Sequence, residues 1–500
     1  MTLHLVDRAE AYSNHTAIVV EEDAYTYSDL LRASSIVATR LLSGRKNLNA
    51  GRICILVPPG WDYVVTLWGI WRAGGVAVPM AISHPPAELA HVIEDAKPEA
   101  IIAHPTLFAQ INNLANKRGI PVLDGSTLSQ EIPLCEIPIV EEEGPSMILY
   151  TSGTTGRPKG VVLTHKNIRS QVESLTVAWG WDHDDHILLH LPLHHVHGIV
   201  NVLLSALWNG STCEIFPRFN AVEVWERLSH RNITLYMAVP TIYRRLIEAW
   251  KRANSATRTA WASGASACRL SVSGSAALPV TTLDMWEEIT GQRLLERYGM
   301  TEIGMALSNP LDSERRPGYV GKALPGIEVR LVDEANHLVA EGEPGLIQVR
   351  GATVFNEYWR QPKETEAAFT TDGWFITGDQ AVVEAGAYRI LGRSSVDILK
   401  TGGEKISALE IEGVMLTHPG VRECAVVGVP DVDWGDRICA AIVSEDKDHL
   451  SADELRAFAK KRLAPYKVPK EILIVPELPR NTMGKVTKPE VLQFFKPDKA

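Results

Sequence analysis

Short apolar runs alternate with amphipathic stretches through about the first 390 residues. The amphipathic stretches repeat their apolar positions with helical spacing, and the apolar runs between them have the length and composition of buried strands. Strands that alternate with helices indicate a parallel or mixed sheet covered on both faces, which places ligands at the carboxyl ends of its strands. We therefore predict strands at 52–58, 100–103, 146–150, 160–163, 235–239 and 269–273, and helices at 63–73, 88–96, 221–230 and 241–251.

A different pattern begins near residue 390. Candidate strands at 387–392, 398–399, 424–429 and 438–443 are interleaved with candidate helices at 408–417 and 451–463. The second helix has Ser451 as its candidate N-cap and Glu454 three residues later, the spacing of a capping box. A chain of 500 residues is too long for one hydrophobic core. We therefore predict an α/β fold with a large N-terminal domain, residues 1–393, and a small, mobile α+β C-terminal domain, residues 394–500.

Composition narrows the class of protein. With 45% hydrophobic and 22% charged residues, the chain has the composition of a folded soluble protein. A formal charge of −10 provides no broad cationic face, which argues against nucleic-acid binding but not against a local site for a small anion. The six cysteines are scattered without a CxxC pair, so we expect buried, reduced thiols. The first residues lack a targeting pattern and the apolar runs are too short to span a membrane, so we expect a cytoplasmic enzyme.

The segment 151–160, TSGTTGRPKG, is the most informative stretch of the chain. Its glycines permit tight turns, its backbone N–H groups and hydroxyls can donate to phosphate oxygens, and Lys159 adds a positive charge. An ordinary solvent-exposed turn is the alternative. Apolar runs enter and leave the segment, its exit is strand-like, and the Walker pattern GxxxxGK[ST] is absent. Taken alone, the segment predicts a nucleotide site.

This segment resembles the phosphate loop of the adenylate-forming superfamily, which includes acyl-CoA synthetases, adenylation domains of peptide synthetases and beetle luciferases. Four further motifs follow in the expected order: YGMTE at 298–302, TGD at 377–379, GRSSVDILKTGG at 392–403 and PRNTMGK at 479–485. The similarity covers essentially the whole chain, and five ordered motifs are far more specific than any one of them. The resemblance implies that an acid's carboxylate attacks the α-phosphorus of ATP, expelling pyrophosphate, and that the acyl group then passes to coenzyme A.

The resemblance also implies roles for single residues. Tyr298 would lie against the adenine, Thr301 would donate to the α-phosphate, and Glu302 would hold Mg²⁺, for which one carboxylate beside phosphate oxygens suffices. Asp379 would accept from both ribose hydroxyls. Arg393 would reach the ribose or the phosphates, with an interdomain salt bridge as the alternative. The full set of predicted ATP-binding residues is Thr151, Ser152, Gly153, Thr154, Thr155, Gly156, Lys159, Ser275, Ala276, Tyr298, Gly299, Met300 and Asp379.

The resemblance places the remaining chemistry in the small domain. Lys485 would enter the active site from that domain and neutralise the reacting carboxylate and the α-phosphate, although a lone lysine in a polar loop is more often a solvated charge. The hinge for rotation between the two half-reactions would be Ser395, where relatives often have Asp or Lys. Gly402 and Gly403 would face the pantetheine tunnel, because glycine lets a thin chain pass the backbone.

The segment 190–198, HLPLHHVHG, bears on the identity of the acid. Its four histidines suggest a metal site, but zinc needs a third protein ligand and usually a nearby carboxylate or cysteine, and none is obvious. The resemblance instead makes His195 a gate of the acyl pocket. That pocket would draw on the segments 239–245, 271–278 and 299–305, and the predicted substrate-binding residues are Arg245, His195, Ser273 and Met305.

A dicarboxylate needs a buried cation for its distal end, ideally a bidentate arginine. The segments LPLHHVHG, MAVPTIY, VSGSAALP and LLERYGMTEIGMALSNP are most similar to malonyl- and methylmalonyl-CoA synthetases, whose pocket arginine matches Arg245. At least one of Arg244 and Arg245 must nevertheless lie on the exposed face of a helix. We predict malonate or a small 2-substituted malonate as the acid. The alternatives are a medium-chain or aromatic acid, an amino-acid-activating domain, a luciferase-like oxygenase and a non-catalytic nucleotide-binding regulator.

Overall fold

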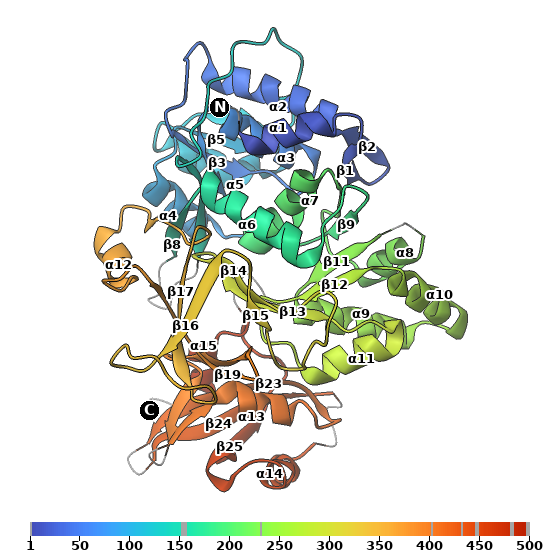
Figure 1. The fold of residues 1–500 in the computed structure, drawn as a ribbon, viewed down its shortest axis with the longest axis vertical. Helices are drawn as coiled ribbons and strands as arrows, with labels where there is room; N and C mark the ends of the chain where they lie inside the picture. Colours follow the sequence, from blue (N-terminus) through green and yellow to red (C-terminus); the bar gives the residue numbers. More distant parts are fainter. Residues whose placement is uncertain are drawn as a thin grey trace.

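The computed structural model describes residues 3–151, 158–230, 233–401, 404–431, 434–445, 450–480 and 485–496. Three sheets precede residue 394 and a fourth follows it. The mixed α/β architecture with a smaller C-terminal α+β unit is the predicted fold class. In Figure 1 most elements after residue 398, among them α13, β24, β25 and α14, gather at the lower end of the molecule.

The largest sheet has nine strands and forms one wall of the candidate site. Its strands β1, β10, β9, β11, β12 and β13 pair in parallel, because helices cross over between most of them, whereas β2, β14 and β15 add antiparallel edges. The order is β15-β14-β13-β12-β11-β9-β10-β1-β2. The bounds are β1 Thr16–Val20, β2 Asp23–Thr26, β9 His186–Leu189, β10 Thr212–Ile215, β11 Leu235–Ala238, β12 Leu270–Ser273, β13 Leu295–Met300, β14 Gly304–Ser308 and β15 Lys322–Ala323.

The second sheet has seven strands and carries the phosphate-loop segment. Two of its strands, β7 and β8, form an antiparallel hairpin on either side of residues 152–158. The strand predicted at the exit of the phosphate-loop segment is therefore confirmed. The order is β18-β8-β7-β4-β3-β5-β6. The bounds are β3 Arg52–Leu56, β4 Val76–Pro79, β5 Ala100–Ala103, β6 Val122–Asp124, β7 Pro145–Thr151, β8 Lys159–Thr164 and β18 Glu357–Tyr358.

Helices cover both of these sheets. Local sequence sets several of their ends: Thr26 with Asp29 and Thr164 with Asn167 form capping boxes, and Gly180 ends α6 in the left-handed region. The bounds are α1 His4–Ala11, α2 Tyr27–Leu42, α3 Trp61–Arg72, α4 Pro86–Ala96, α5 Phe108–Asn116, α6 His165–Trp179, α7 Ser205–Asn209, α8 Ala221–His230, α9 Pro240–Arg252, α10 Ser255–Ser266, α11 Val280–Thr290 and α12 Pro362–Ala367, with a 3₁₀ turn η1 at Pro105–Leu107 and a π-helix η2 at His197–Leu204.

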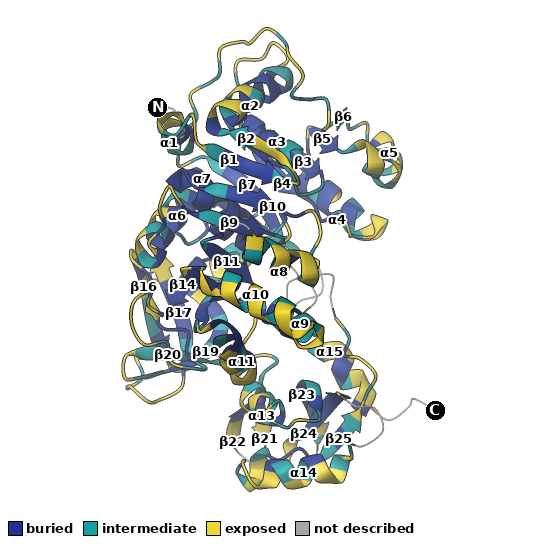
Figure 2. Cartoon of the chain, turned by 90° about the vertical axis from the view of Figure 1, so that its right-hand side faces the viewer, coloured by how far each residue is buried: buried dark blue, intermediate teal, exposed yellow. Residues whose placement is uncertain are grey.

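The core lies between the sheets and these helices. Figure 2 shows buried strands flanked by helices whose outer faces are exposed, as on α10. One cluster stacks Trp225 of α8 between Trp261 of α10 and Trp286 of α11, with ring centroids 5.8 and 5.5 Å away. Tyr243 of α9 joins this cluster and donates its hydroxyl to the carbonyl of Val272 on β12 over 2.9 Å. The packing fixes the orientation of α9 against the sheet.

A four-stranded antiparallel sheet follows in the large domain, in the order β16-β17-β19-β20. Its bounds are β16 Ile327–Val332, β17 Gly345–Gly351, β19 Phe375–Glu384 and β20 Ala387–Arg393. We expected the segment 387–392 to begin the C-terminal pattern, and this grouping is wrong. The segment pairs with β19, so that Asp379 lies opposite Arg393. A local pattern of six residues does not reveal which strand a segment pairs with.

The C-terminal unit has a five-stranded sheet and short helices. Its core residues run from Leu399 onward, while the clusters of the large domain end at Ile390. The division between residues 393 and 394 stays a prediction. The Ser451 hydroxyl accepts from the Glu454 N–H over 3.2 Å, which confirms the predicted N-cap. The bounds are β21 Ile398–Thr401, β22 Glu404–Ser407, β23 Val421–Asp431, β24 Gly435–Ser444 and β25 Glu471–Ile474, α13 Ala408–Met415, α14 Ala452–Lys460 and α15 Lys488–Val491, with 3₁₀ turns η3 Pro465–Lys467 and η4 Leu492–Phe495.

Two expectations from composition can be compared with the structure. No helix in the described part of the chain is both long and apolar enough to cross a bilayer. All six cysteines are unpaired, and Cys54, Cys213, Cys268 and Cys439 are buried. The expectation of a buried thiol is wrong for Cys135, which is exposed because it lies in the irregular surface segment between β6 and β7.

Candidate functional site

The ends of the phosphate-loop segment are held by the β7–β8 hairpin. Thr151 lies opposite Lys159 in that hairpin, and the predicted residues Ser152, Gly153, Thr154, Thr155 and Gly156 lie outside the described residues. The Lys159 ammonium is 2.5 Å from a carboxylate oxygen of Glu364 on α12 and 5.2 Å from the ring centroid of Tyr358. Tyr358 belongs to β18, which pairs with β8. The chain therefore surrounds this lysine with one anion and one aromatic ring.

Glu302 lies in the turn between β13 and β14, directly after Thr301. Its Oε1 atom accepts a hydrogen bond from the Tyr358 hydroxyl over 3.1 Å. Burial raises the pKa of Glu302, while the Tyr358 hydrogen bond and the charge of Arg393 oppose that shift. A carboxylate whose charge is disfavoured by burial gains from a cation, and its oxygen is the ligand type that Mg²⁺ prefers. The residue therefore has the donor chemistry expected of a magnesium ligand.

A buried carboxylate links three strands beside this turn. The Oδ2 atom of Asp379 on β19 accepts from the Tyr298 hydroxyl of β13 over 2.6 Å. Its Oδ1 atom accepts from Nε of Arg393, the last residue of β20, over 3.1 Å. Asp379 is 7% exposed. The structure thus brings together three residues that the sequence places far apart, next to Gly299, Met300 and Thr301 at the end of β13.

The segment that follows β12 forms the next part of the site. Ser275 has a φ of +70°, a strained value for a residue other than glycine, and its hydroxyl lies 3.2 Å from Nδ1 of His197. Ser273 is buried, and its hydroxyl has no hydrogen-bond partner among the described residues. Ala276 is exposed, and Met305 of β14 is buried. The carboxyl end of β12 therefore faces the histidine segment, as expected for parallel strands.

The histidines of segment 190–198 are held neutral by their surroundings. Burial lowers the pKa of His195 and of His197 well below the usual value, and neighbouring positive groups, Lys485 among them, add to the effect. Within the described ranges, the group of side chains close enough to hold a metal is Asp182, His183 and Asp184, an exposed cluster outside this segment. The role of His195 as a gate of the acyl pocket stays a prediction.

Arg297 is the residue that the sequence reasoning missed. It lies on β13 with 3% exposure, and its Nε and Nη2 atoms have no hydrogen-bond partner among the described residues. A side chain at Gly274 would begin 2.5 Å from the guanidinium, so this glycine makes room for it. Burial lowers the pKa of Arg297 to about 9, and its charge acts on His197 and Lys485. The sequence signal was a charged pair, ER, inside the buried strand of LLERYGMTE.

The two arginines of VPTIYRR have different surroundings. Arg245 is exposed on α9, and no hydrogen-bond or ion-pair partner is found for it in the described ranges. Arg244 is half-buried and contacts Glu248 over 2.8 Å and Glu423 of β23 over 3.2 Å. The substrate-binding role of Arg245 stays a prediction. The buried cation of the site is Arg297.

Lys485 lies among charged groups of the large domain. The charges of Arg393, Arg297, Asp379 and Glu302 act on its ammonium, which in turn acts on His195 and His197. Burial and the two arginines lower the pKa of Lys485. The residue as a whole is exposed. Ser395 is exposed between β20 and β21, and Gly402 and Gly403 lie outside the described residues.

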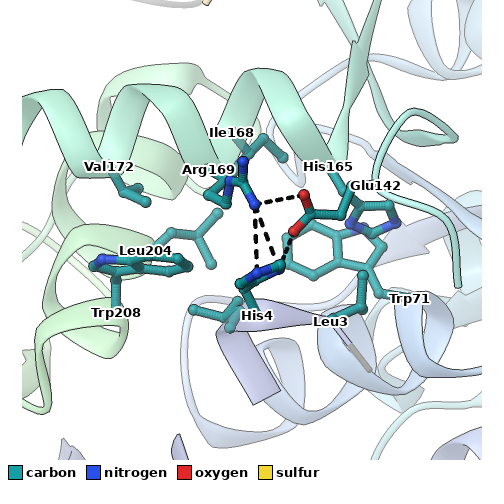
Figure 3. A pocket seen from close by; sticks show the side chains of 11 residues that line it. Leu3, His4, Trp71, Glu142, His165, Ile168, Arg169, Val172, Leu204 and Trp208 are labelled. Carbon is teal, nitrogen blue, oxygen red and sulfur yellow. Dashed lines mark hydrogen bonds and ion pairs between the residues drawn. The ribbon is translucent and has the colours of Figure 1, made fainter. Parts of the chain in front are cut away.

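A separate cavity lies between α1 and α6, away from these residues (Figure 3). Trp71, Trp208 and Val172 line it, and Glu142 contacts both His4 and Arg169, the latter over 2.6 Å. Its volume of about 30 Å³ is room for a water molecule or two, not for a nucleotide or an acyl group. The cavity is a packing feature of the N-terminal helix.

Comparisons with known proteins agree with this geometry. The AMP-binding enzyme family matches residues 5–359, and the AMP-binding enzyme C-terminal domain matches residues 410–485. The mitochondrial malonate–CoA ligase ACSF3 of Xenopus laevis is 44% identical over 98% of this chain and 91% of its own length. The ATP-bound MatB structure of Rhodopseudomonas palustris superposes with a TM-score of 0.91 at 32% identity, over 99% of both chains.

Another solved structure superposes less closely on this chain. A malonyl-CoA ligase with methylmalonyl-CoA and AMP bound has 36% identity and a TM-score of 0.70, over 94% of this chain and 98% of that one. Because the family match spans most of the chain and relatives at 44% identity span nearly all of it, this chain belongs to the AMP-binding enzyme family.

Proposed function

We propose that this chain is an ATP-dependent malonate–CoA ligase. In the first half-reaction a malonate carboxylate oxygen bonds to the α-phosphorus of ATP and the bond to pyrophosphate breaks. In the second, the thiol of coenzyme A loses its proton, its sulfur bonds to the acyl carbon and the bond to AMP breaks, leaving malonyl-CoA. The observation that carries the choice of acid is the buried Arg297 guanidinium, which has two unpartnered nitrogens. The names of the relatives support the same reaction.

The energetics of Arg297 favour a dicarboxylate. A buried charge without a partner is costly, and a fatty or aromatic acid would leave this guanidinium unpaired against an apolar tail. The distal carboxylate of malonate offers two oxygens that match the planar fork of an arginine. Gly274 keeps the space beside the guanidinium free of a side chain. Arg245, matched to the pocket arginine of related synthetases, is a second candidate for the same carboxylate.

The ATP side of the site supplies the charges that adenylation needs. Two anions must meet at the α-phosphorus, so catalysis depends on cations and donors fixed around that atom. Lys485 and Arg393 are the cations, Thr301 is the hydroxyl donor, and Asp379 with Tyr298 holds the nucleoside. Bound Mg²⁺ would neutralise charge on the phosphates, and Glu302 is its protein ligand in this proposal, with ATP and coenzyme A as co-substrates.

The histidine segment separates the acid from the incoming thiol. His195 and His197 are neutral, so they shape the acyl pocket without repelling Lys485 or competing with Arg297 for the carboxylate. Rotation about Ser395 would then bring Gly402 and Gly403 to this gate for thioester formation. The expected cytoplasmic location stays a prediction, since the animal relatives are named as mitochondrial proteins.

An ATP–pyrophosphate exchange panel tests the proposal. Malonate, methylmalonate, octanoate and benzoate are compared with wild-type enzyme, Arg297→Met and Arg245→Ala. We expect malonate to support the fastest exchange in wild-type enzyme and Arg297→Met to abolish that preference. Faster exchange with octanoate or benzoate in wild-type enzyme would refute the choice of malonate. A loss confined to Arg245→Ala would transfer the carboxylate-binding role to that residue.

A further inference from the structure

One carboxylate of the small domain, that of Glu423, contacts both α9 of the large domain and Arg480, five residues before Lys485. The Oε1 atom of Glu423 on β23 lies 3.2 Å from Nη2 of Arg244 on α9, and Oε2 forms an ion pair with Arg480. The Glu423 side chain is 16% exposed and both arginines are 30% exposed. Arg422 adds a weaker contact over 4.0 Å. An anion this enclosed, between two cations, is screened less by water than a surface pair.

The two arginines that contact Glu423 belong to different parts of the chain: Arg480 precedes Lys485 in the small domain, and Arg244 lies on α9 of the large domain. Arg480 pairs with Val486 in an isolated β-bridge, and this bridge closes the segment that carries Lys485. Arg244 follows Tyr243, whose packing in the tryptophan cluster fixes this part of α9. The Arg244 side chain also forms an ion pair with Glu248 of the same helix. Glu423 therefore connects α9, the helix that follows the carboxyl end of β11, to Arg480, at the start of the segment that carries Lys485.

We propose that Glu423 is a positioning residue for adenylation: it clamps the small domain to α9 and so holds Lys485 at the α-phosphorus. The proposal rests on the adenylating function and on the role of Lys485 proposed above. The clamp belongs to the arrangement seen here, which superposes better on the ATP-bound relative than on the complex with methylmalonyl-CoA and AMP. A half-reaction that needs the small domain elsewhere must release Arg244 from Glu423.

A second ion pair between the two parts of the chain provides a matched control. Lys405 of β22 lies 2.7 Å from Glu334, in the loop after β16, beside a cleft of about 750 Å³ between the four-stranded sheet and the small domain. The Lys405 side chain is 53% exposed and the Glu334 side chain is 81% exposed. Exposed pairs contribute little because water and salt screen them. Breaking this pair removes a contact between the same two parts of the chain but leaves the ion pair of Glu423 with Arg480 intact.

The experiment compares the two half-reactions in Glu423→Gln and Arg244→Gln, with Glu334→Gln as the control. Adenylation is followed by ATP–pyrophosphate exchange with the acid that wild-type enzyme uses best. Thioester formation is followed with the corresponding synthetic acyl-adenylate and coenzyme A. Thermal unfolding of each variant reports whether the fold is intact.

We expect Glu423→Gln and Arg244→Gln to slow exchange by about tenfold, as misplacement of a catalytic group does, while thioester formation stays at the wild-type rate or rises. Glu423→Asp, which keeps the charge, should recover part of the exchange rate, and the Glu334→Gln control should behave as wild type. Equal losses in both half-reactions, or unchanged exchange in folded Glu423→Gln, would overturn the clamp. Wild-type enzyme without exchange on any acid would instead overturn the proposed function, and the clamp with it.

Discussion

The Tyr358 hydroxyl donates to Oε1 of Glu302 over 3.1 Å, while the Lys159 ammonium lies 5.2 Å from the centre of the same ring. Lys159 begins β8 of the seven-stranded sheet, and Glu302 follows β13 of the nine-stranded sheet. One tyrosine therefore contacts both the cation of the phosphate loop and the candidate magnesium carboxylate. This contact ties together the two sheets on which the ATP site is built.

Replacing Tyr358 by Phe should weaken magnesium binding without unfolding the protein. The substitution removes the hydrogen bond that orients Glu302, and loss of such an outer partner typically lowers metal affinity about 10-fold or more. We expect a correspondingly higher Mg²⁺ concentration for half-maximal pyrophosphate exchange, and the same shift in calorimetric binding of Mg²⁺ with a non-hydrolysable ATP analogue. Tyr319→Phe, which removes the hydroxyl bonded to Glu384 away from these residues, is the control. Identical Mg²⁺ curves for wild type and Tyr358→Phe would contradict the assignment.

Arg297→Met should abolish the use of malonate without destabilising the fold. Removing an unpaired buried charge in favour of an apolar chain of similar length leaves the free energy of unfolding unchanged or raises it by about 1–3 kcal/mol. The same change should abolish malonate-dependent exchange. The free energy of unfolding is measured with denaturant, and the malonate-dependent exchange rate is measured on the same preparations of wild type and Arg297→Met. A strongly destabilised variant would mean that Arg297 has a structural partner, and a variant that still uses malonate would mean that another group binds the distal carboxylate.

The sequence predicted the elements well where periodicity is local. The helix at 221–230 and the strand at 100–103 coincide with α8 and β5, because a clear apolar face or a short apolar run defines each of them. The pairing of β20 with β19 was not predictable in this way, since strand pairing joins residues that are distant in sequence.

The site shows the same division between local and distant information. Tyr298, Asp379 and Arg393 were named from motifs, and the structure brings them into contact. Arg297 was missed because the letters ERY do not show which strand residue faces the pocket and which arginine lacks a partner. The exposure of Arg245 was equally hidden, because adjacent positions on one helix differ in orientation by about 100°.

Lys485→Ala should separate the half-reactions. The ammonium lies among Arg393, Asp379 and Glu302, where charge develops during adenylation, so its loss should slow exchange by about 100- to 1,000-fold. Thioester formation from supplied acyl-adenylate should survive, because in the proposed cycle the small domain rotates away from this position before that step. Lys400→Ala, at an exposed position of the same domain, is the control. A parallel loss of both rates would disprove the assigned role.

Glu296 should make the protein less stable as pH rises. Burial raises its pKa from the ordinary 4.5 to about 7, so the folded state binds this proton more tightly than the unfolded state. The free energy of unfolding should therefore fall between pH 4.5 and about 7, by roughly 3 kcal/mol, and level off above that range. Glu296→Gln should lack this fall, whereas Glu288→Gln, an exposed change on α11, should keep it. Urea unfolding measured across this pH range gives the free energy of unfolding of each variant. If this free energy changed with pH in the same way in wild type and in Glu296→Gln, the explanation would be ruled out.

Ser395→Pro should impair thioester formation more than adenylation. Proline fixes φ and removes the backbone N–H, so it restricts rotation at the exposed position that follows the GR pair. The structure superposes better on the ATP-bound relative than on the complex with methylmalonyl-CoA and AMP, so we expect exchange, which needs no rotation in the proposed cycle, to change little. Equal losses in the two assays would place the hinge elsewhere.

The most direct measurement follows the intermediate itself. The enzyme is incubated with ATP, Mg²⁺ and malonate, and the products are analysed by mass spectrometry before and after addition of coenzyme A. The account predicts malonyl-adenylate and pyrophosphate before the addition, and malonyl-CoA with an equal amount of AMP after it. Purified protein that binds ATP yet yields no acyl-adenylate with malonate, methylmalonate, octanoate or benzoate would contradict it.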